Sequence, residues 1–263
     1  MTGTPRPLSR AEAWLLGALG LGAFFALWWA AAASGLVVRQ FLPSPLEVAQ
    51  RIAYLLTEPF AGATLPTHLA RSFERYAYGF LLAAVIGVPL GLLMGWFRWL
   101  DEVITPIFDG LRFIAPIAWV PFAALWFGTG IGGPIMIIFS GAFPPCLINA
   151  YRGAKFVDRT FVEAAQMLGT GNLRTILQVL LPASFPSIVA GLRIGAGLGW
   201  QSLVGAELIV AQAGVGYMMV QGQSNLSTPT VVAGMIAIGC VGLVIDVVLR
   251  QFEAFVRGRR GLA

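Results

Sequence analysis

Six long apolar stretches dominate this sequence, and they restrict its possible folds more than any other feature. Each holds about 20 residues with few charges, the length that a helix needs to cross the hydrocarbon core of a bilayer. Helices are required because lipid offers no hydrogen-bonding partner to an exposed backbone. The predicted spans cover residues 14–34, 76–97, 103–127, 131–150, 183–208 and 231–249.

The composition supports an integral membrane protein. Hydrophobic residues make up 57% of the chain and charged residues 11%, whereas soluble domains average about 45–50% and about 25%. The net charge is +5, but the basic residues mostly end apolar segments instead of forming an exposed patch. We therefore expect membrane lipid as a partner and no nucleic acid.

The few reactive side chains argue against an enzyme. The only lysine, Lys155, is followed by Phe156, so a Gly-Lys-Ser/Thr phosphate-binding loop is absent. The only histidine, His68, excludes zinc sites with two histidines and most acid–base triads. Cys146 and Cys240 lie in apolar stretches and are expected to be packing residues. No cofactor or metal is expected on this chain, so any ATP that drives it must bind another polypeptide.

Positive charges predict the orientation of the chain in the membrane. With the N-terminus inside, the inner segments hold eleven basic residues and the outer segments four, as the positive-inside rule requires. Both termini are therefore expected to be cytoplasmic. The inner residues are Arg6, Arg10, Arg98, Arg152, Lys155, Arg159, Arg174, Arg250, Arg257, Arg259 and Arg260, and the outer ones are Arg39, Arg51, Arg71 and Arg75.

This topology divides the chain into four segments. Residues 1–40 contain the first span; a cleaved signal peptide is the alternative, but the apolar run exceeds the about 7–15 residues of a signal core. Residues 41–66 are expected outside, with an amphipathic helix at 45–56 that Ser44 caps and Pro45 begins. Residues 67–252 form the transmembrane domain, in which 212–230 is re-entrant or interfacial, and residues 253–263 form a cytoplasmic tail.

Small residues recur at every fourth position in two spans, which lets helix backbones approach closely in lipid. Prolines interrupt several spans, which is tolerated where protein or a cavity covers the freed backbone groups. Both features favour a tight bundle that lines a pathway and shifts between states, although ordinary packing explains the small residues equally well. The small residues are Ala83, Gly87, Gly91, Gly95, Gly191, Gly195 and Gly199, and the prolines are Pro89, Pro106, Pro116, Pro121, Pro144 and Pro145.

A polar passage between the fourth and fifth spans has the features of a docking helix. Thr160 and Glu163 fit a capping box, and Ala164 and Ala165 add helix propensity without bulk. Gly169 suits the left-handed residue that ends a helix. A second short helix is expected from about residue 172. Several apolar side chains in this loop should need a partner, as in a helix that lies in a groove: Phe156, Phe161, Val162, Met167 and Leu168.

The spacing of Glu163-Ala164-Ala165, Gly169 and Leu181-Pro182 resembles the EAA signature of ABC importer permeases. Val179 stands where this family usually has Ile. Over about residues 42–252, further motifs resemble the nitrate/sulfonate/taurine branch of these permeases. These motifs are Leu42-Pro43-Ser44-Pro45, Ala118-Trp119-Val120-Pro121, Leu125-Trp126-Phe127-Gly128, Gly191-Leu192-Arg193, Ala206-Glu207-Leu208 and Gly214-Val215-Gly216-Tyr217.

The resemblance implies an all-α, MetI-like transmembrane domain of a type I importer in a bacterial inner (plasma) membrane. It implies a homodimer with two cytoplasmic ABC ATPase subunits, which hold ATP and Mg²⁺, and a periplasmic or lipid-anchored substrate-binding protein. The chain itself is then not an enzyme. By resemblance, the ATPase-coupling helix and its C-terminal signature comprise Glu163, Ala164, Ala165, Gly169, Leu181 and Pro182.

Ionisable side chains inside the spans are candidate pathway residues, because charges at membrane depth are costly. Asp109 and Arg112 share one helix face, and a local ion pair is the alternative. Arg193 has no acid close to it on its own helix, since Glu207 is fourteen residues away. We expect Arg193 to bind backbone carbonyls or another helix, or to attract an anion, which a guanidinium group suits.

The outer end of the fifth span carries three candidate gate residues, Gln201, Ser202 and Glu207. In the sixth span, Asp246 is expected to pair with Arg250, four residues later. Together these features predict the permease subunit of an ATP-driven importer for a small anionic solute such as nitrate, taurine, another sulfonate or a related organic acid. Aromatic acids and thiamine or riboflavin precursors fit the branch as well. A secondary transporter, a membrane-embedded enzyme and a membrane scaffold are the alternatives.

Overall fold

The computed structural model describes residues 9–35, 37–38, 40–128, 130–209 and 211–259. Within these residues the chain folds into helices, and five are long and apolar enough to cross a membrane. A sixth span results if one bent pair of helices is counted, so the prediction of about six membrane helices is confirmed. Arg6, Arg39 and Arg260, which contributed to the predicted topology, lie outside the described residues.

Helix α6 (Gly132–Lys155) lies at the centre of the bundle, between α3 (Leu65–Trp96) and α9 (Leu181–Ile209). The small-residue stripes predicted from the sequence face this central helix. A Cβ atom at Gly91 would lie 2.4 Å from the carbonyl oxygen of Leu147, and one at Gly195 would lie 2.9 Å from that of Ala142. Close backbone contact therefore holds α3, α6 and α9 together, as expected where lipid gives apolar burial little driving force.

The close approach at Gly195 leads to a testable prediction. Gly195→Val should lower the free energy of unfolding by about 2 kcal/mol, because the added atoms overlap the backbone and Cys146 of α6. Gly197→Val is the matched control on the same helix, since a Cβ atom there has no neighbour within 4 Å. Thermal unfolding in lipid nanodiscs would measure both variants, and equal losses of stability would contradict the packing described here.

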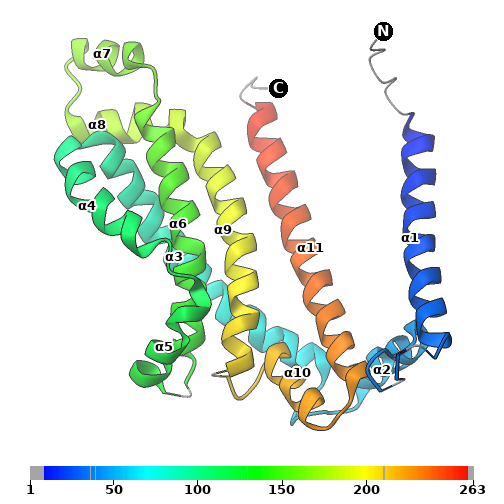
Figure 1. Cartoon of the computed structure of the whole chain (residues 1–263). Helices are drawn as coiled ribbons and strands as arrows, with labels where there is room; N and C mark the ends of the chain where they lie inside the picture. Colours follow the sequence, from blue (N-terminus) through cyan, green and yellow to red (C-terminus); the bar gives the residue numbers. More distant parts are fainter. Residues whose placement is uncertain (1–8, 36, 39, 129, 210, 260–263) are drawn as a thin grey trace.

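Helix α11 (Thr228–Arg259) packs beside α9, where the indole Nε1 of Trp200 donates a 3.0 Å hydrogen bond to the carbonyl oxygen of Ile238. Helix α1 (Arg10–Ala33) stands apart from the bundle (Figure 1), and its most apolar segment is not buried against the rest of the protein. Its link to the rest runs through Trp28, whose Nε1 donates a hydrogen bond to the carbonyl oxygen of Pro43 at 3.0 Å.

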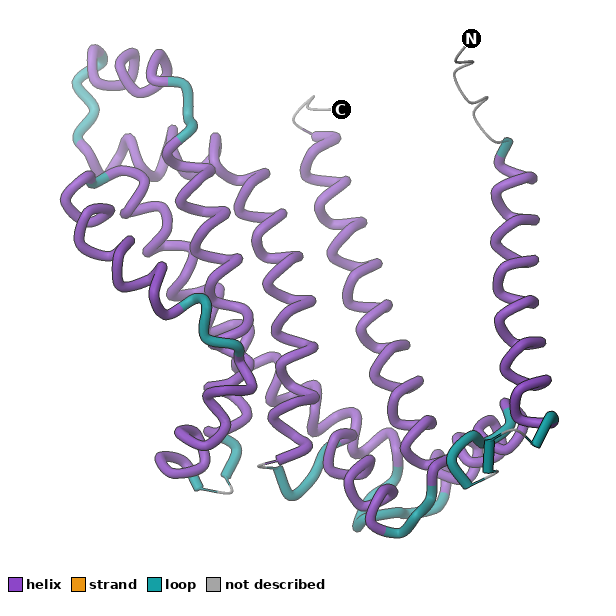
Figure 2. The backbone as a smooth tube through the Cα atoms, in the orientation of Figure 1, coloured by secondary structure: helices purple, strands orange, loops and turns teal. Residues whose placement is uncertain are grey.

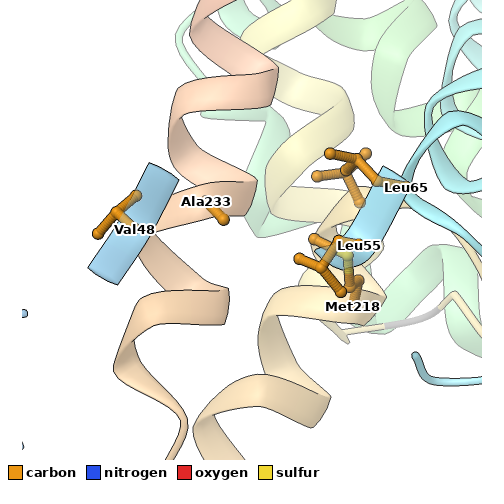
Figure 3. Packing of buried hydrophobic residues seen from close by; sticks show 6 residues of the cluster. Val48, Leu55, Leu65, Met218 and Ala233 are labelled. Carbon is orange, nitrogen blue, oxygen red and sulfur yellow. The ribbon is translucent and has the colours of Figure 1, made fainter. Parts of the chain in front are cut away.

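The amphipathic helix predicted at 45–56 is α2 (Pro45–Thr57). Ser44 and Glu47 form a complete capping box, with hydrogen bonds of 2.8 and 3.3 Å. Val48 and Leu55 on the buried face of α2 pack in a cluster with Leu65 of α3 and with residues of α10 (Val215–Ser224) and α11. Figure 3 shows this cluster, to which Met218 and Ala233 contribute. It joins α2, α3, α10 and α11 at one end of the molecule.

The third predicted span, 103–127, is not a straight helix, and this expectation is corrected. Helix α4 (Arg98–Leu111) ends before residues 112–115, and the following 3₁₀ turn η1 (Pro116–Trp119) and α5 (Val120–Phe127) leave at an angle of 87° (Figure 2). The break is explained by Pro116, because a residue that precedes proline avoids the helical conformation. Ala115 accordingly has φ −58° and ψ 139°. Pro89, Pro106, Pro144 and Pro145, by contrast, remain inside continuous helices.

Other predicted boundaries differ from the helix ends. The boundary at 66/67 falls inside α3, and the one at 252/253 falls inside α11, so residues 253–259 continue helix α11. The region 212–230 contains the short helix α10. Helix α7 (Arg159–Met167) lies at the same end of the bundle as the start of α1 and the end of α11, whereas α2, α5 and α10 lie at the opposite end (Figure 1).

Candidate docking helix and membrane-embedded charges

The predicted docking helix forms, but it starts earlier than expected. Asp158, not Thr160, caps α7: its carboxylate accepts hydrogen bonds from the Thr160 amide at 2.9 Å and from the Thr160 hydroxyl at 2.8 Å. The amide hydrogen bond holds the pKa of Asp158 below its usual range. The predicted capping box of Thr160 and Glu163 is therefore wrong, because a carboxylate two residues earlier already satisfies the first-turn amide.

The C-terminal end of α7 follows the prediction. Gly169 has φ +76°, the left-handed conformation that glycine adopts without a steric penalty. The amide of Thr170 donates to the carbonyl oxygen of Ala165 at 3.2 Å, and the Gly169 amide donates to that of Gln166 at 2.9 Å. These bonds reverse the chain into the short helix α8 (Asn172–Thr175), which confirms the helix expected near residue 172.

Large apolar side chains are exposed on α7 and its flanks, beside polar ones. Met167 is 90% exposed and Leu168 85%, and Phe156 and Phe161 are exposed as well, as the sequence predicted, whereas Val162 is half-buried. Glu163 and Ala164 are also exposed, whereas Ala165 is buried beneath the helix. The small side chains thus leave the backbone of α7 accessible between larger apolar groups, which is the surface that a groove on another protein could cover.

Beneath α7, a cavity of about 520 Å³ separates it from the ends of α3, α4 and α6. Its charged walls include Arg98, Asp101, Lys155, Arg159 and Glu163. Asp101 is held there by Lys155 at 3.1 Å and by the Tyr151 hydroxyl at 2.8 Å.

The Leu181-Pro182 pair begins α9, directly after a π-helical turn, η2 (Ile176–Leu180). Because Pro182 has no amide hydrogen, the regular α-helical ladder cannot run through it unchanged. A wide turn of this kind accommodates such a break without ending the helix. The fifth predicted span therefore extends in the structure over Asn172–Ile209.

The candidate pathway residues do not form one group. Asp109 and Arg112 make the local ion pair that was the alternative interpretation, with 2.8 Å between the Arg112 Nε and the Asp109 Oδ1. Arg112, Gln201 and Ser202 line one cavity of about 370 Å³ between the α4–η1 break, α6 and α9.

Arg193 forms ion pairs with two carboxylates of α11. Its Nε donates to Asp246 at 3.0 Å and its Nη1 to Glu253 at 3.1 Å. Asp246 also binds Arg250 at 2.6 Å, as predicted. The geometry supports a structural role for Arg193, although its partners are carboxylates and not backbone carbonyls. The sequence placed Glu253 in a tail, so this pairing was missed.

Glu207 is enclosed by protein and is only 2% exposed, so it lines no open gate in this structure. It accepts hydrogen bonds from the Ser72 hydroxyl at 2.8 Å, from Arg75 at 2.9 Å and from the amide of Gly216 at 3.0 Å. His68, one turn before Ser72, accepts from the amide of Gly214 at 3.3 Å. This network fixes the turn between α9 and α10 against α3.

The sequence drew attention to His68 only as the single histidine and to Arg75 only as an outer basic residue, and it did not single out Ser72. A signal was present, since positions 68, 72 and 75 share one face of a helix and the only histidine is among them. Their partners Glu207 and Gly214 lie more than 130 residues away in the sequence, and only the fold reveals them.

The comparison with protein families decides the class of this chain. Residues 87–258 match the family described as "Binding-protein-dependent transport system inner membrane component". The matched region covers the last third of α3, all of α4 to α10, including the docking helix, and nearly all of α11. The chain belongs to this family.

Individual permeases of the family support the predicted branch. The taurine transport system permease protein TauC of Escherichia coli is 34% identical over 94% of this chain and 90% of its own length. The nitrate import permease protein NrtB of Synechocystis is 33% identical over 82% of this chain and 80% of its own length. The chain is thus a permease of the binding-protein-dependent ABC importers, in an inner membrane, and its relatives are transporter subunits and not enzymes.

The permease fold is also found in a solved structure. An inward-facing conformation of the MetNI methionine ABC transporter matches 71% of this chain and 91% of its own chain, with a TM-score of 0.56 and 19% identity. This likeness confirms the predicted MetI-like, all-α fold.

Proposed function

We propose that this permease forms, with a second copy of itself, the translocation pathway of an ATP-driven importer for a small anionic solute. Two cytoplasmic ABC ATPases would each bind α7 of one permease copy. A periplasmic or lipid-anchored binding protein would deliver the solute at the opposite end of the permease. The ATPases would hold ATP and Mg²⁺, and this chain would carry no cofactor.

The surface of α7 carries this proposal. It combines exposed apolar side chains, the small residues Ala164 and Ala165, and a left-handed turn at Gly169, all at one end of the bundle. An exposed apolar surface of this kind marks a site of protein contact. Closure of the ATPases would move the two α7 helices together, and α6 and α9, joined by close backbone contacts, would transmit the movement.

The orientation follows from the same surface. If α7 meets a cytoplasmic ATPase, the start of α1 and the end of α11 are cytoplasmic too, because they lie at the same end (Figure 1). The described basic residues at this end include Arg98, Lys155, Arg159 and Arg174, which agrees with the positive-inside rule.

The names of the relatives support a solute with an oxyanion group, because taurine is a zwitterion that carries a sulfonate group and nitrate is an inorganic anion. A guanidinium group on the proposed pathway would suit either. Arg112 is the better placed of the two candidates, since it lines a cavity whereas Arg193 is paired with α11.

Transport by purified components tests the proposal. Proteoliposomes would carry the permease with the ATPase on the inner side and the binding protein outside. They should take up taurine or nitrate only when ATP is enclosed with the ATPase. Uptake by this chain alone, driven by an ion gradient, would contradict the proposal and favour a secondary transporter.

A further inference from the structure

We propose that the break between α4 and η1 forms a binding site for an organic anion, with the anionic head at Arg112 and an apolar body in an adjoining aromatic cavity. The inference rests on the proposed function and narrows it. It assigns the solute to organic sulfonates or carboxylates and not to nitrate.

The break itself indicates a cavity that a polar ligand can enter. Residues 113–115 separate the end of α4, capped by Arg112, from η1 inside a predicted span, at a bend of 87°. Irregular backbone at membrane depth is tolerated only where it is covered by protein or lines a cavity that holds water. The cavity of about 370 Å³ beside Ala115 and Pro116 meets this requirement.

The cationic group of this site is Arg112. Its side chain is 35% exposed and that of its partner Asp109 is 48% exposed, so the pair is accessible. An accessible ion pair between residues three apart contributes little free energy, and an incoming anion can replace the Asp109 carboxylate. The fork of guanidinium donors matches the oxygens of a sulfonate or carboxylate.

The polar wall of the cavity supplies few further donors. The hydroxyls of Ser140 and Ser202 already donate to the carbonyl oxygens of Ile137 and Leu198, at 2.8 and 2.7 Å. The side-chain amide of Gln201 is exposed to the cavity and can donate to an anion opposite Arg112. The head group would therefore be held mainly by Arg112, with Gln201 as the second donor.

On its other side, Arg112 borders a second cavity of about 190 Å³. The two cavities share Arg112, Ser140 and Pro144, so they adjoin. The walls of the second cavity are mostly aromatic or aliphatic and include Phe108, Trp119, Met136, Phe139 and Phe143.

This arrangement distinguishes two kinds of anion. Nitrate would use the head-group site alone. An alkyl or aryl sulfonate would also bury its apolar body in the aromatic cavity. Each buried methylene group should raise the affinity about fourfold.

Equilibrium binding to the full chain tests the site. The chain would be placed in phosphatidylcholine nanodiscs, so that no anionic lipid competes, and titrated with nitrate and with methane-, ethane-, propane- and butanesulfonate. Affinity should rise about fourfold per methylene, to about 60-fold from methane- to butanesulfonate, and nitrate should bind no better than methanesulfonate.

Three variants separate the parts of the site. Arg112→Gln should weaken all the sulfonates at least tenfold, whereas Asp109→Asn, which removes the competing carboxylate, should strengthen them. Met136→Trp should fill the aromatic cavity and abolish the dependence on chain length, while methanesulfonate still binds. This last variant leaves the Asp109–Arg112 pair intact, so it tests the site even if Arg112→Gln fails to fold.

Equal affinity for nitrate and butanesulfonate, or unchanged binding by Arg112→Gln, would overturn the inference. Binding of the purified ATPase to the same nanodiscs tests the proposed function separately. A chain that binds the ATPase but does not distinguish the sulfonates refutes this site alone. A chain that binds no ATPase refutes the proposed function, whichever anion it prefers.

Discussion

Glu207→Gln is expected to lower the free energy of unfolding by about 3 kcal/mol, because it removes one partner of a buried ion pair. Arg75 is only 12% exposed on its side chain, and without the Glu207 carboxylate its charge would be left with the carbonyl oxygen of Ala213. Ser72 and the amide of Gly216 would also lose a charged acceptor. We expect α10 to detach from α3, which hydrogen exchange at Val215–Ser224 would detect.

Glu102→Gln is the matched control. It makes the same chemical change in the ion pair with Arg98, whose side chains are 92% and 64% exposed, and it should cost less than about 1 kcal/mol. The double variant Arg75→Gln/Glu207→Gln should lose less unfolding free energy than the two single variants lose in sum, because no unpaired charge remains. If Glu207→Gln were as stable as Glu102→Gln, the network would not hold α10 in place.

The second large effect concerns α7. Met167→Asp/Leu168→Asp should weaken the association of the permease with its ATPase about a hundredfold, because two large exposed apolar side chains in the proposed interface become charged. The stability of the permease itself should not change, since both side chains are exposed. Binding of the purified ATPase to the chain in nanodiscs measures the first effect, and thermal unfolding measures the second.

Leu226→Asp controls for the added charge. Leu226 is 70% exposed and lies between α10 and α11, at the end of the molecule opposite α7. It has φ +53°, a conformation that aspartate tolerates, so this variant should fold and bind the ATPase normally. Equal loss of binding by both variants would show that charge alone weakens the complex, and would contradict a specific role for α7.

Local sequence patterns predicted the parts of the fold that depend on neighbouring residues. Ser44-Pro45 and Glu47 specified the start of α2, and Gly169 specified the turn after α7. The glycine stripes were visible because helix periodicity brings every fourth residue to one face. Their partner helix, α6, could not be read from spacing alone, because contact between spans depends on their arrangement in space.

Where two local signals competed, the sequence did not show which one would prevail. Both Asp158 and Thr160 can cap a helix, and the carboxylate prevailed. Several prolines lie in apolar stretches, yet only Pro116 coincides with the sharp bend in the predicted spans. Pro144 and Pro145 lie in α6, which packs between α3 and α9, whereas Pro89 and Pro106 are exposed and still lie inside continuous helices. Packing therefore accounts for only part of the difference.

Long-range pairing accounts for the changes in the candidate pathway. Arg193 and Glu207 were grouped with Arg112 because all three are charged inside spans. Arg193 finds Asp246 and Glu253, 53 and 60 residues away, and Glu207 finds Arg75, 132 residues away. The part of the group around Arg112 lies next to a cavity. Charge within a span therefore predicted that a partner exists, but not which one.

Photo-crosslinking from α7 in intact membranes tests the central claim most directly. A photoreactive benzophenone side chain at position 167, in place of the exposed Met167, should form a covalent adduct with an ATP-hydrolysing subunit when the native assembly is irradiated. The same group in place of Leu226 should form no adduct with the ATPase. An adduct of the Met167 position with a protein on the outer side of the membrane, or no adduct with an ATPase in an assembly that transports its solute, would contradict the account.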